Sequence, residues 1–403
     1  MAGRQRLSAL LLLWSWACVV PAFASGYVPR GTCAGFPRVD IQAPKGHCVA
    51  LLADGSSGLR APRRILEVAP GRFWIVDMGS WERRQGRLLE LRLDEDPSLP
   101  APQVQLTVLA EKLDRPLGLA RGPDGKVYVA EAGRIWRTAL STVRQETVVD
   151  GLPDDGVHPL KEIAFGRPGQ LFFNLGSATD DCRDASGGYP QPCPEIAGPR
   201  PRAAVYEAVL GSPAWRLQSM RPWATGLRNS VALAYVPEAD VLLQGENSID
   251  YADENEPPET LNLLRRQSDH GWPHCVGARQ PARGQEGHAD CRLGAAPLQL
   301  WPAHAAPLQL LAVPRSMPGP LSGRLVVAWH GYRKHGHRVV SWALNGKGVP
   351  TGPMQTWLGG WSAREGVRPQ GAPTGLAVDA RGRLFVVEDR NATVLMVAPE
   401  DAP

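Results

Sequence analysis

The chain has 403 residues, and its 44 basic and 40 acidic side chains give a formal net charge of +4. Because no block of basic residues interrupts this balance, the composition does not indicate a nucleic-acid partner. Glycine and proline are abundant, at 43 and 38 residues, which favours many short strands joined by turns. No segment reaches the roughly 20 apolar residues that a membrane span needs.

The N-terminus has the order of features that is typical of an export signal. Arg4 and Arg6 precede an apolar run over 10–20, and small residues follow at Ala22 and Ala24. This order predicts a cleaved signal peptide over 1–24 and a periplasmic or secreted mature chain. Lipidation at Cys18 is the alternative interpretation.

Removal of the signal leaves six of the seven cysteines, and an even number in an exported chain indicates disulfides. Their spacing favours bonds between neighbours, although six cysteines permit 15 connectivities. A metal cluster is the other interpretation, but the chain has no Cys-x-x-Cys. The neighbouring pairs are Cys33 with Cys48, Cys182 with Cys193, and Cys275 with Cys291.

An internal repeat extends over most of the mature chain. An apolar strand, a Pro/Gly/Asp turn and a second apolar strand recur at 65–77, 117–130, 163–174, 231–243, 308–327 and 374–387. Six units share the mature chain at roughly 63 residues each, enough for a four-stranded sheet with loops. The repeat predicts one domain over 25–403, an all-β, six-bladed β-propeller of four-stranded antiparallel blades. A sandwich or several small β domains is the alternative.

The residues just ahead of the repeated strands share a chemical character. In a propeller the first strand of each blade lines the central channel, so these side chains are expected at one mouth of it. Guanidinium groups pair with carboxylates in a bidentate manner, and the set therefore predicts a ring that attracts an anionic ligand. The positions, none of which is a carboxylate, are Arg64, Arg115, His158, Arg228 with Asn229, His304 and Arg368.

A dense acidic stretch over 246–259 follows the fourth repeat. Carboxylates at this density provide the hard oxygen ligands that suit Ca²⁺, although the spacing is not that of an EF-hand. A solvated acidic loop is the alternative interpretation.

Several motifs follow one another in a recognisable order. They are His158 ahead of 163–177, Gly226-Leu-Arg-Asn229, the run 255–262 before Gly271-Trp-Pro273, Trp301-Pro-Ala-His304, Trp329-His-Gly331 and Arg368-Pro369. This ordered set resembles the soluble glucose and sorbosone dehydrogenases, which use pyrroloquinoline quinone (PQQ) with Ca²⁺. The resemblance covers nearly all of the mature chain.

The resemblance implies a role for individual residues. His158 matches the catalytic base, and Arg228, Asn229, His304 and Arg368 match cofactor-facing positions. The basic loop over 329–338 is shorter than that of the family, so the resemblance leaves open which of its cations binds the cofactor. The choices are Arg333, Lys334 and Arg338.

The resemblance also implies two metal positions. Backbone oxygens around Gly245 and Glu246 match the place where the cofactor's Ca²⁺ is held, and Asp250 and Asp253 are expected to bind a second, structural calcium. The implied activity is oxidation of the C1 hydroxyl of an aldose or related sugar or aldehyde, with hydride transfer to PQQ. A cytochrome or quinone would then accept the electrons.

Two other functions remain open from the sequence. A calcium-dependent lactonase can also use a six-bladed propeller, but it would need carboxylates that converge on a metal in the channel. A binding propeller without catalysis is the other alternative, since arginine alone can bind an anion.

Overall fold

All six repeated hairpins form in the computed structural model, which describes residues 26–361 and 370–400. Each hairpin supplies the first two antiparallel strands of a sheet. The pairs are β4 (Pro62–Ala69) with β5 (Arg72–Asp77), β8 (Leu119–Arg121) with β9 (Val127–Ala130), β12 (Ile163–Phe165) with β13 (Gln170–Leu175), β16 (Ala232–Val236) with β17 (Val241–Glu246), β23 (Pro307–Ala312) with β24 (Arg324–Trp329), and β27 (Pro373–Val378) with β28 (Leu384–Glu388).

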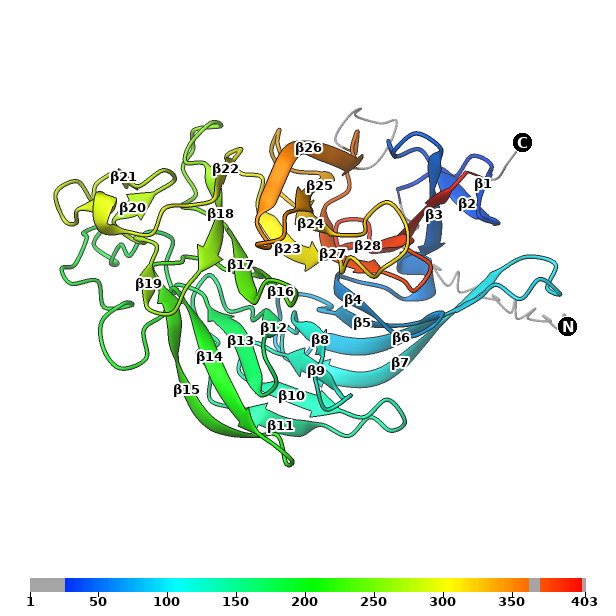
Figure 1. The fold of residues 1–403 in the computed structure, drawn as a ribbon, viewed down its shortest axis with the longest axis horizontal. Helices are drawn as coiled ribbons and strands as arrows, with labels where there is room; N and C mark the ends of the chain where they lie inside the picture. Colours follow the sequence, from blue (N-terminus) through cyan, green and yellow to red (C-terminus); the bar gives the residue numbers. More distant parts are fainter. Residues whose placement is uncertain (1–25, 362–369, 401–403) are drawn as a thin grey trace, which may run out of the picture.

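Two further strands complete each sheet. In chain order they are β6 (Gly86–Asp94) and β7 (Gln103–Leu113), β10 (Ile135–Thr138) and β11 (Glu146–Val149), β14 (Ala204–Gly211) and β15 (Arg216–Thr225), β18 (Glu259–Leu264) and β22 (Gln299–Trp301), β25 (Arg338–Leu344) and β26 (Pro350–Leu358), and β29 (Thr393–Pro399) with β3 (His47–Ala53). Because β3 comes from the N-terminal part of the chain, the last sheet joins both ends of the fold, and Figure 1 shows blue β3 beside the red strands.

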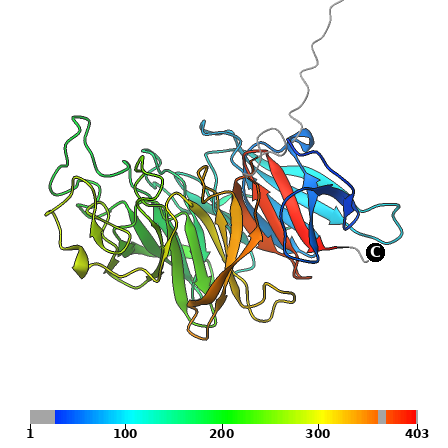
Figure 2. The same cartoon turned by 90° about the horizontal axis from the view of Figure 1, so that it is seen from above.

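Smaller elements decorate this arrangement. β1 (Thr32–Cys33) and β2 (Phe36–Val39) extend the sixth sheet, and β19 (Ser268–Asp269) adds to the third. The long connection between β18 and β22 also contains β20 (Cys275–Val276), β21 (Gln280–Pro281) and the short helix η2 (Cys291–Leu293), while η1 (Gly55–Ser57) follows β3. The view in Figure 2 shows green and yellow loops gathered at one end of the molecule.

The first strands of the six sheets form a closed ring. Each of β4, β8, β12, β16, β23 and β27 contacts the first strands of both neighbouring sheets. The structure is therefore a six-bladed β-propeller, as the repeat predicted.

The core lies between the blades, because both faces of each sheet are covered. In β5, Phe73 and Ile75 pack toward the sixth blade, whereas Trp74 and Val76 pack toward the second. Side chains alternate between the two faces of a strand, so a continuous apolar run serves both neighbours. Six buried clusters fill the six spaces between adjacent blades in this way.

One arginine occupies the centre of the ring. Arg64 in β4 is 1% exposed, and its Nε donates to Glu162 Oε2 at 2.5 Å. Its terminal nitrogens also donate to the carbonyl oxygens of Thr374, Val231 and Leu308 at 2.5, 3.0 and 2.6 Å. A residue from the first blade thus binds the third, fourth, fifth and sixth, and it closes the channel.

The three neighbouring cysteine pairs are disulfide-bonded, as predicted: Cys33–Cys48, Cys182–Cys193 and Cys275–Cys291. Within the described ranges, no helix has the length and apolar character to cross a membrane. The predicted signal peptide over 1–24, Cys18 and Arg368 lie outside the described residues.

Candidate active site

A cavity of about 400 Å³ lies at one end of the ring. Its walls come from loops that precede the first strands of blades and from loops that join second to third strands. His158, predicted as the catalytic base, lines it together with four residues predicted to face the cofactor: Arg228, Asn229, His304 and Arg333. Asp250, predicted to bind calcium, lines it as well. The sequence therefore identified side chains that are far apart in the chain and share one cavity.

The inner end of the cavity is apolar. Leu117, Leu160, Val231 and Leu308 line it, and Leu117, Leu160 and Val231 belong to one buried cluster. Arg64 donates to the carbonyl oxygens of Val231 and Leu308. The cavity consequently opens toward one face of the propeller only, because the Arg64 cluster fills the channel behind it.

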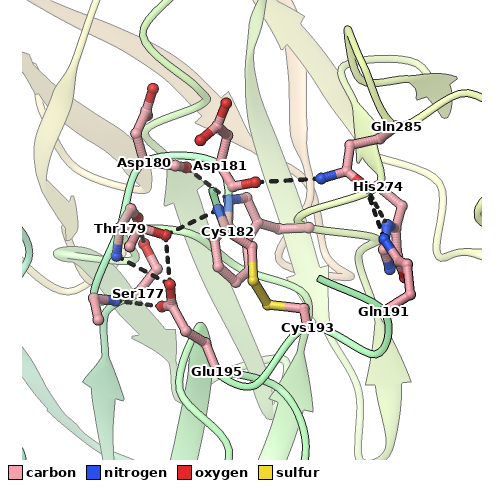
Figure 3. The surroundings of a disulfide bond; sticks show 12 residues. Ser177, Thr179, Asp180, Asp181, Cys182, Gln191, Cys193, Glu195, His274 and Gln285 are labelled. Carbon is pink, nitrogen blue, oxygen red and sulfur yellow. Dashed lines mark hydrogen bonds between the residues drawn. A yellow bond between two sulfur atoms is a disulfide. The ribbon is translucent and has the colours of Figure 1, made fainter. Parts of the chain in front are cut away.

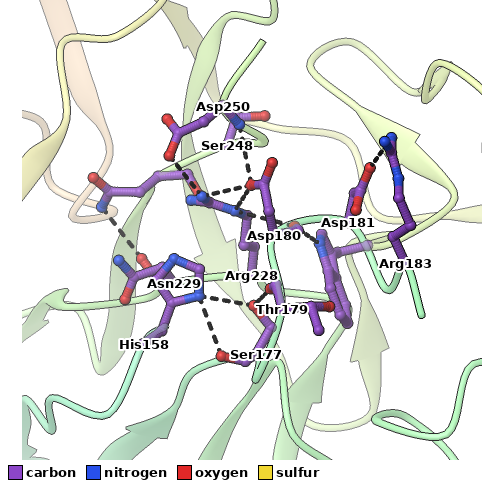
Figure 4. A network of polar contacts seen from close by, with 12 residues as sticks. His158, Ser177, Thr179, Asp180, Asp181, Arg183, Arg228, Asn229, Ser248 and Asp250 are labelled. Carbon is purple, nitrogen blue, oxygen red and sulfur yellow. Dashed lines mark hydrogen bonds and ion pairs between the residues drawn. The ribbon is translucent and has the colours of Figure 1, made fainter. Parts of the chain in front are cut away.

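The hydrogen bonds of His158 fix its tautomer. Its Nδ1 lies 2.9 Å from Ser177 Oγ and 3.2 Å from Ser177 O (Figure 4). The single hydroxyl proton of Ser177 is donated to Thr179 O at 2.6 Å. Both Ser177 oxygens must therefore accept at Nδ1, so Nδ1 carries the proton and the Nε2 lone pair remains free to act as a base.

The surroundings of His158 also keep it neutral. Burial lowers the pKa of His158 to about 3, and the positive charge of Arg228 contributes in the same direction. Lys161, which follows closely in sequence, is held elsewhere. Its ammonium group donates to the carbonyl oxygens of Pro153 and Pro159 at 2.8 and 2.5 Å.

Arg228 is held by two carboxylates (Figure 4). Its Nε donates to Asp180 Oδ1 at 2.7 Å and its Nη2 to Asp250 Oδ2 at 2.9 Å, while Nη1 donates to Asn247 O at 3.1 Å. The Arg228 side chain is 4% exposed, but that of Asp250 is 72% exposed. The Asp180 side chain is 38% exposed. The guanidinium is thus fixed in position, and both of its partners are accessible from solvent, Asp250 more than Asp180.

One short segment positions both His158 and Arg228, and a disulfide supports it (Figure 3). The segment 177–181 supplies Ser177 to the histidine and Asp180 to the arginine. Glu195, two residues after Cys193, accepts at Oε1 from Thr179 N at 3.1 Å and from Thr179 Oγ1 at 2.5 Å. The Cys182–Cys193 bond therefore holds this carboxylate against the segment that orients the site.

His304 and Arg333 both line the cavity and contact each other. His304 Nε2 is 2.7 Å from Asp253 O and 2.9 Å from Arg333 Nη1. Of the three cations that the sequence left open, only Arg333 lines the cavity. Arg338 instead donates to the carbonyl oxygens of Gly336 and Lys334 at 3.1 Å each, and Lys334 does not line the cavity.

The side chains of the predicted metal residues do not gather into a cluster, whereas the role of the backbone oxygens around Gly245 and Glu246 stays a prediction. Gly245 lies inside the fourth blade, where a Cβ would meet Pro307 at 3.1 Å. The Glu246 carboxylate accepts from Asn229 N at 3.3 Å and Gln244 Nε2 at 2.5 Å, and Asp250 pairs with Arg228. Asp253 lies 3.6 Å from Arg283. The described residues contain no group of three or more His, Cys, Asp or Glu side chains that could hold a metal.

The expectation of a cationic ring without carboxylates needs correction. Arg64 is buried in the channel with Glu162, which directly precedes β12. Arg115 is held by Asp114 at 2.8 Å and by Asp154 at 3.6 Å, and it does not line the cavity. The channel-facing arginines are consequently paired with acids.

Several lining residues had no individual role predicted from the sequence. His330, Tyr332 and Glu259 lie in segments that the sequence singled out, whereas Arg63 and Trp81 were missed. Glu259 is buried and accepts from Ser248 N at 2.6 Å, and burial raises the pKa of its carboxyl to about 8. Strand alternation could have indicated Arg63, because neighbouring residues in β4 face opposite sides and Arg64 points into the channel.

Comparisons with known proteins agree with this architecture. No family model matches the sequence, and no curated protein matches it. Among solved structures, a carbohydrate-active enzyme of family AA12 from Trichoderma reesei superposes with a TM-score of 0.69 at 19% identity, over 92% of this chain and 100% of that one. The PQQ domain of pyranose dehydrogenase from Coprinopsis cinerea gives 0.68 at 21% identity, over 91% and 99%.

A bacterial structure has the same fold with a lower score. The soluble aldose sugar dehydrogenase from Escherichia coli, in its apo form, gives a TM-score of 0.55 at 15% identity, over 88% of this chain and 100% of that one. The superpositions show a shared fold, and at identities this low they show the fold alone.

Proposed function

We propose that this protein is a PQQ-dependent sugar dehydrogenase that oxidises the C1 hydroxyl of an aldose or related sugar. The observation that carries the proposal is the neutral, tautomer-fixed imidazole of His158 in a closed-ended cavity beside Arg228. The shared fold with the PQQ domain of a pyranose dehydrogenase supports the choice of cofactor.

The donors around the cavity fit a flat, multiply carboxylated quinone. Arg63, Arg228 and Arg333 supply guanidinium groups above an apolar inner end. Arg63 Nε and Asn229 Oδ1 are buried polar atoms without a hydrogen-bond partner in the described part of the chain. Bound PQQ would have to compete with the carboxylates that now pair with these arginines.

The residues of the chain would divide the reaction between them. PQQ, when bound, would supply an electrophilic quinone carbon that accepts the hydride from C1 of the sugar. His158 Nε2 would take the hydroxyl proton, while the Ser177 oxygens retain the Nδ1 proton and stabilise the resulting imidazolium. Arg228 and Arg333 would favour the negative charge that accumulates in the cavity.

Among the described residues, no three or more acidic, histidine or cysteine side chains form a metal cluster. Calcium would instead be held with the cofactor by backbone oxygens around Gly245 and Glu246. Reoxidation would need an acceptor such as a cytochrome or a quinone. The three disulfides support a location outside the cytoplasm, either periplasmic or secreted. The alternative lactonase would show itself by hydrolysing lactones without quinone.

The decisive experiment is reconstitution of the purified protein with PQQ, with and without Ca²⁺. We expect a shift in the absorbance of PQQ on binding and reduction of an artificial dye in the presence of one or more aldoses. Absence of both the shift and dye reduction across a panel of aldoses rejects the dehydrogenase. A calcium-independent result rejects the calcium requirement alone.

The role of His158 is tested in the reconstituted enzyme. His158→Ala should lower kcat by about 100-fold or more, because general base catalysis contributes a factor of this order. PQQ binding should persist, since other residues supply the charged contacts. His288→Ala, which changes an exposed histidine away from the cavity, is the matched control. Full turnover by the His158 variant would remove this residue from its role.

A further inference from the structure

Two aromatic side chains stand exposed at the cavity. Trp81 is 58% exposed and Tyr332 is 60% exposed, and both line the cavity that holds His158. They are the only large aromatic residues that are exposed to this degree in the described chain. Isolated exposed apolar residues need no explanation, but a pair at one cavity suggests a ligand surface.

Three buried side chains, Arg63, Asp389 and His330, connect the two aromatic rings. Arg63 lies over the Trp81 ring at 5.6 Å, and its Nη1 pairs with Asp389 Oδ2 at 2.8 Å. The other oxygen of Asp389 is 3.0 Å from His330 Nε2, and the His330 ring packs against Tyr332 with centroids 4.8 Å apart. Each aromatic ring is therefore connected to the same aspartate through one intermediate side chain.

This support is buried and charged. The side chains of Arg63, Asp389 and His330 are 6%, 9% and 10% exposed. Burial raises the pKa of the Asp389 carboxyl, but its contacts with His330 and Arg63 outweigh this effect and keep the pKa below its ordinary value. The ionised Asp389 fixes Arg63 and His330, which contact the two aromatic rings. Little ordering of these side chains therefore remains to occur when a ligand binds.

The aromatic pair and the aspartate that connects it come from three neighbouring blades. Trp81 lies between β5 and β6 of the first blade, and Tyr332 between β24 and β25 of the fifth. Asp389 lies between β28 and β29 of the sixth blade, which separates them, and the adjacent Arg390 lies over the Tyr332 ring at 5.5 Å. These loops all join the second strand of a blade to its third, so the pair stands on one rim.

The volume of the cavity limits how much of a ligand lies inside it and how much lies at this rim. At about 400 Å³ it is near the lower end of the range for ligand sites, roughly 300–1,000 Å³. A tricyclic cofactor and one sugar ring would occupy it, and any further sugar ring would lie outside, against the exposed aromatic side chains. The C–H faces of pyranose rings pack on the flat apolar faces of tryptophan and tyrosine.

We propose that Trp81 and Tyr332 form a binding site for a second sugar ring, so that the preferred substrate is an oligosaccharide or glycoside longer than one pyranose unit. This inference rests on the proposed function, because it places the reacting ring at His158.

The test compares glucose, maltose and cellobiose as substrates of the PQQ-reconstituted enzyme. We expect kcat/KM to be higher for at least one disaccharide than for glucose. Trp81→Ala should lower kcat/KM for that disaccharide about tenfold more than for glucose, with an intermediate effect for Trp81→Phe. Leu293→Ala, which shortens an exposed apolar side chain away from the cavity, should change neither value.

A binding measurement separates this inference from the proposed function. Saturation-transfer NMR detects contact between the protein and the second ring of a disaccharide without turnover. Contact at the second ring that is lost in Trp81→Ala supports the subsite even if no aldose is oxidised. Equal loss of kcat/KM for glucose and both disaccharides, or no contact at the second ring, overturns the subsite and leaves the dehydrogenase intact.

Discussion

At the scale of single residues, partners decide what each charged group can do. His158 can serve as a base because Ser177 fixes its Nδ1 proton and burial keeps it neutral. The Arg228 guanidinium is less available to a ligand, because Asp180 and Asp250 already pair with it. The residue types could be read from the sequence, but their partners could not.

The low pKa of His158 predicts the acid limb of activity. A histidine with a lowered pKa stays deprotonated as the pH falls through 6.5, and it loses its function as a base only below that value. In the reconstituted enzyme we therefore expect kcat/KM for an aldose to stay constant as the pH falls from 7 through 6, and to fall only as the pH approaches the His158 pKa of about 3. A profile with its acid limb at or above pH 6.5 would contradict this environment for His158.

A second prediction concerns Asp250, the more exposed partner of Arg228. Asp250→Asn removes a carboxylate that competes with an anionic cofactor, so the Kd for PQQ should fall roughly two- to fivefold, as expected for a pair of which one member is exposed. Isothermal calorimetry measures the change, and Glu256→Gln, which removes an acid paired with Arg283, is the control. If Asp250 instead binds calcium, the same variant will bind PQQ more weakly.

At the scale of elements, loops between strands hold the site and disulfides hold the loops. The sequence predicted the strands well, because alternation and turns are local properties, as in β5 and its turn to β4. It placed His158 at a channel mouth but gave no sign that segment 177–181 contacts it. That contact depends on how the long connection between β13 and β14 folds back.

The disulfide of this connection is expected to matter for the site. Cys182→Ser with Cys193→Ser should weaken PQQ binding about tenfold, because the support of Ser177 and Asp180 is loosened. Cys33→Ser with Cys48→Ser is the matched control, since its sequence separation of 15 is close to the 11 of the other pair. Both double variants should lose about 3 kcal/mol of stability. Equal PQQ affinity in the two would argue against the proposed support.

At the scale of the whole molecule, one buried ion pair connects the blades and closes the channel. Arg64 donates to Glu162 and to the carbonyl oxygens of three further blades. Burial raises the pKa of Glu162, and the charge of Arg64 opposes this effect. The pair thus holds the first strands of the blades together at the centre of the ring and closes the inner end of the cavity.

Removal of one member of this pair should be costly. Arg64→Met leaves Glu162 buried without its partner, and we expect a loss of about 3–5 kcal/mol in stability. Adding Glu162→Gln removes the uncompensated charge and should restore part of the loss. Denaturant unfolding midpoints of the single and double variants measure this difference. A double variant less stable than Arg64→Met would show that the ion pair is not the source of the effect.

The amino-acid sequence by itself determined the six hairpins, because strand alternation and turn chemistry are written along the chain. Cysteine spacing favoured the three disulfides without excluding other pairings, and motif order indicated six residues that line the cavity: His158, Arg228, Asn229, Asp250, His304 and Arg333. Only the tertiary structure decided that Arg63 lines the cavity while Arg64 closes the channel, and that Arg228 is paired with acids. It also decided that Trp81 and Tyr332 are connected to the same Asp389 through Arg63 and His330. These facts depend on which blades become neighbours and on the direction of individual side chains. Both are fixed when the ring closes and have no local signature in the sequence.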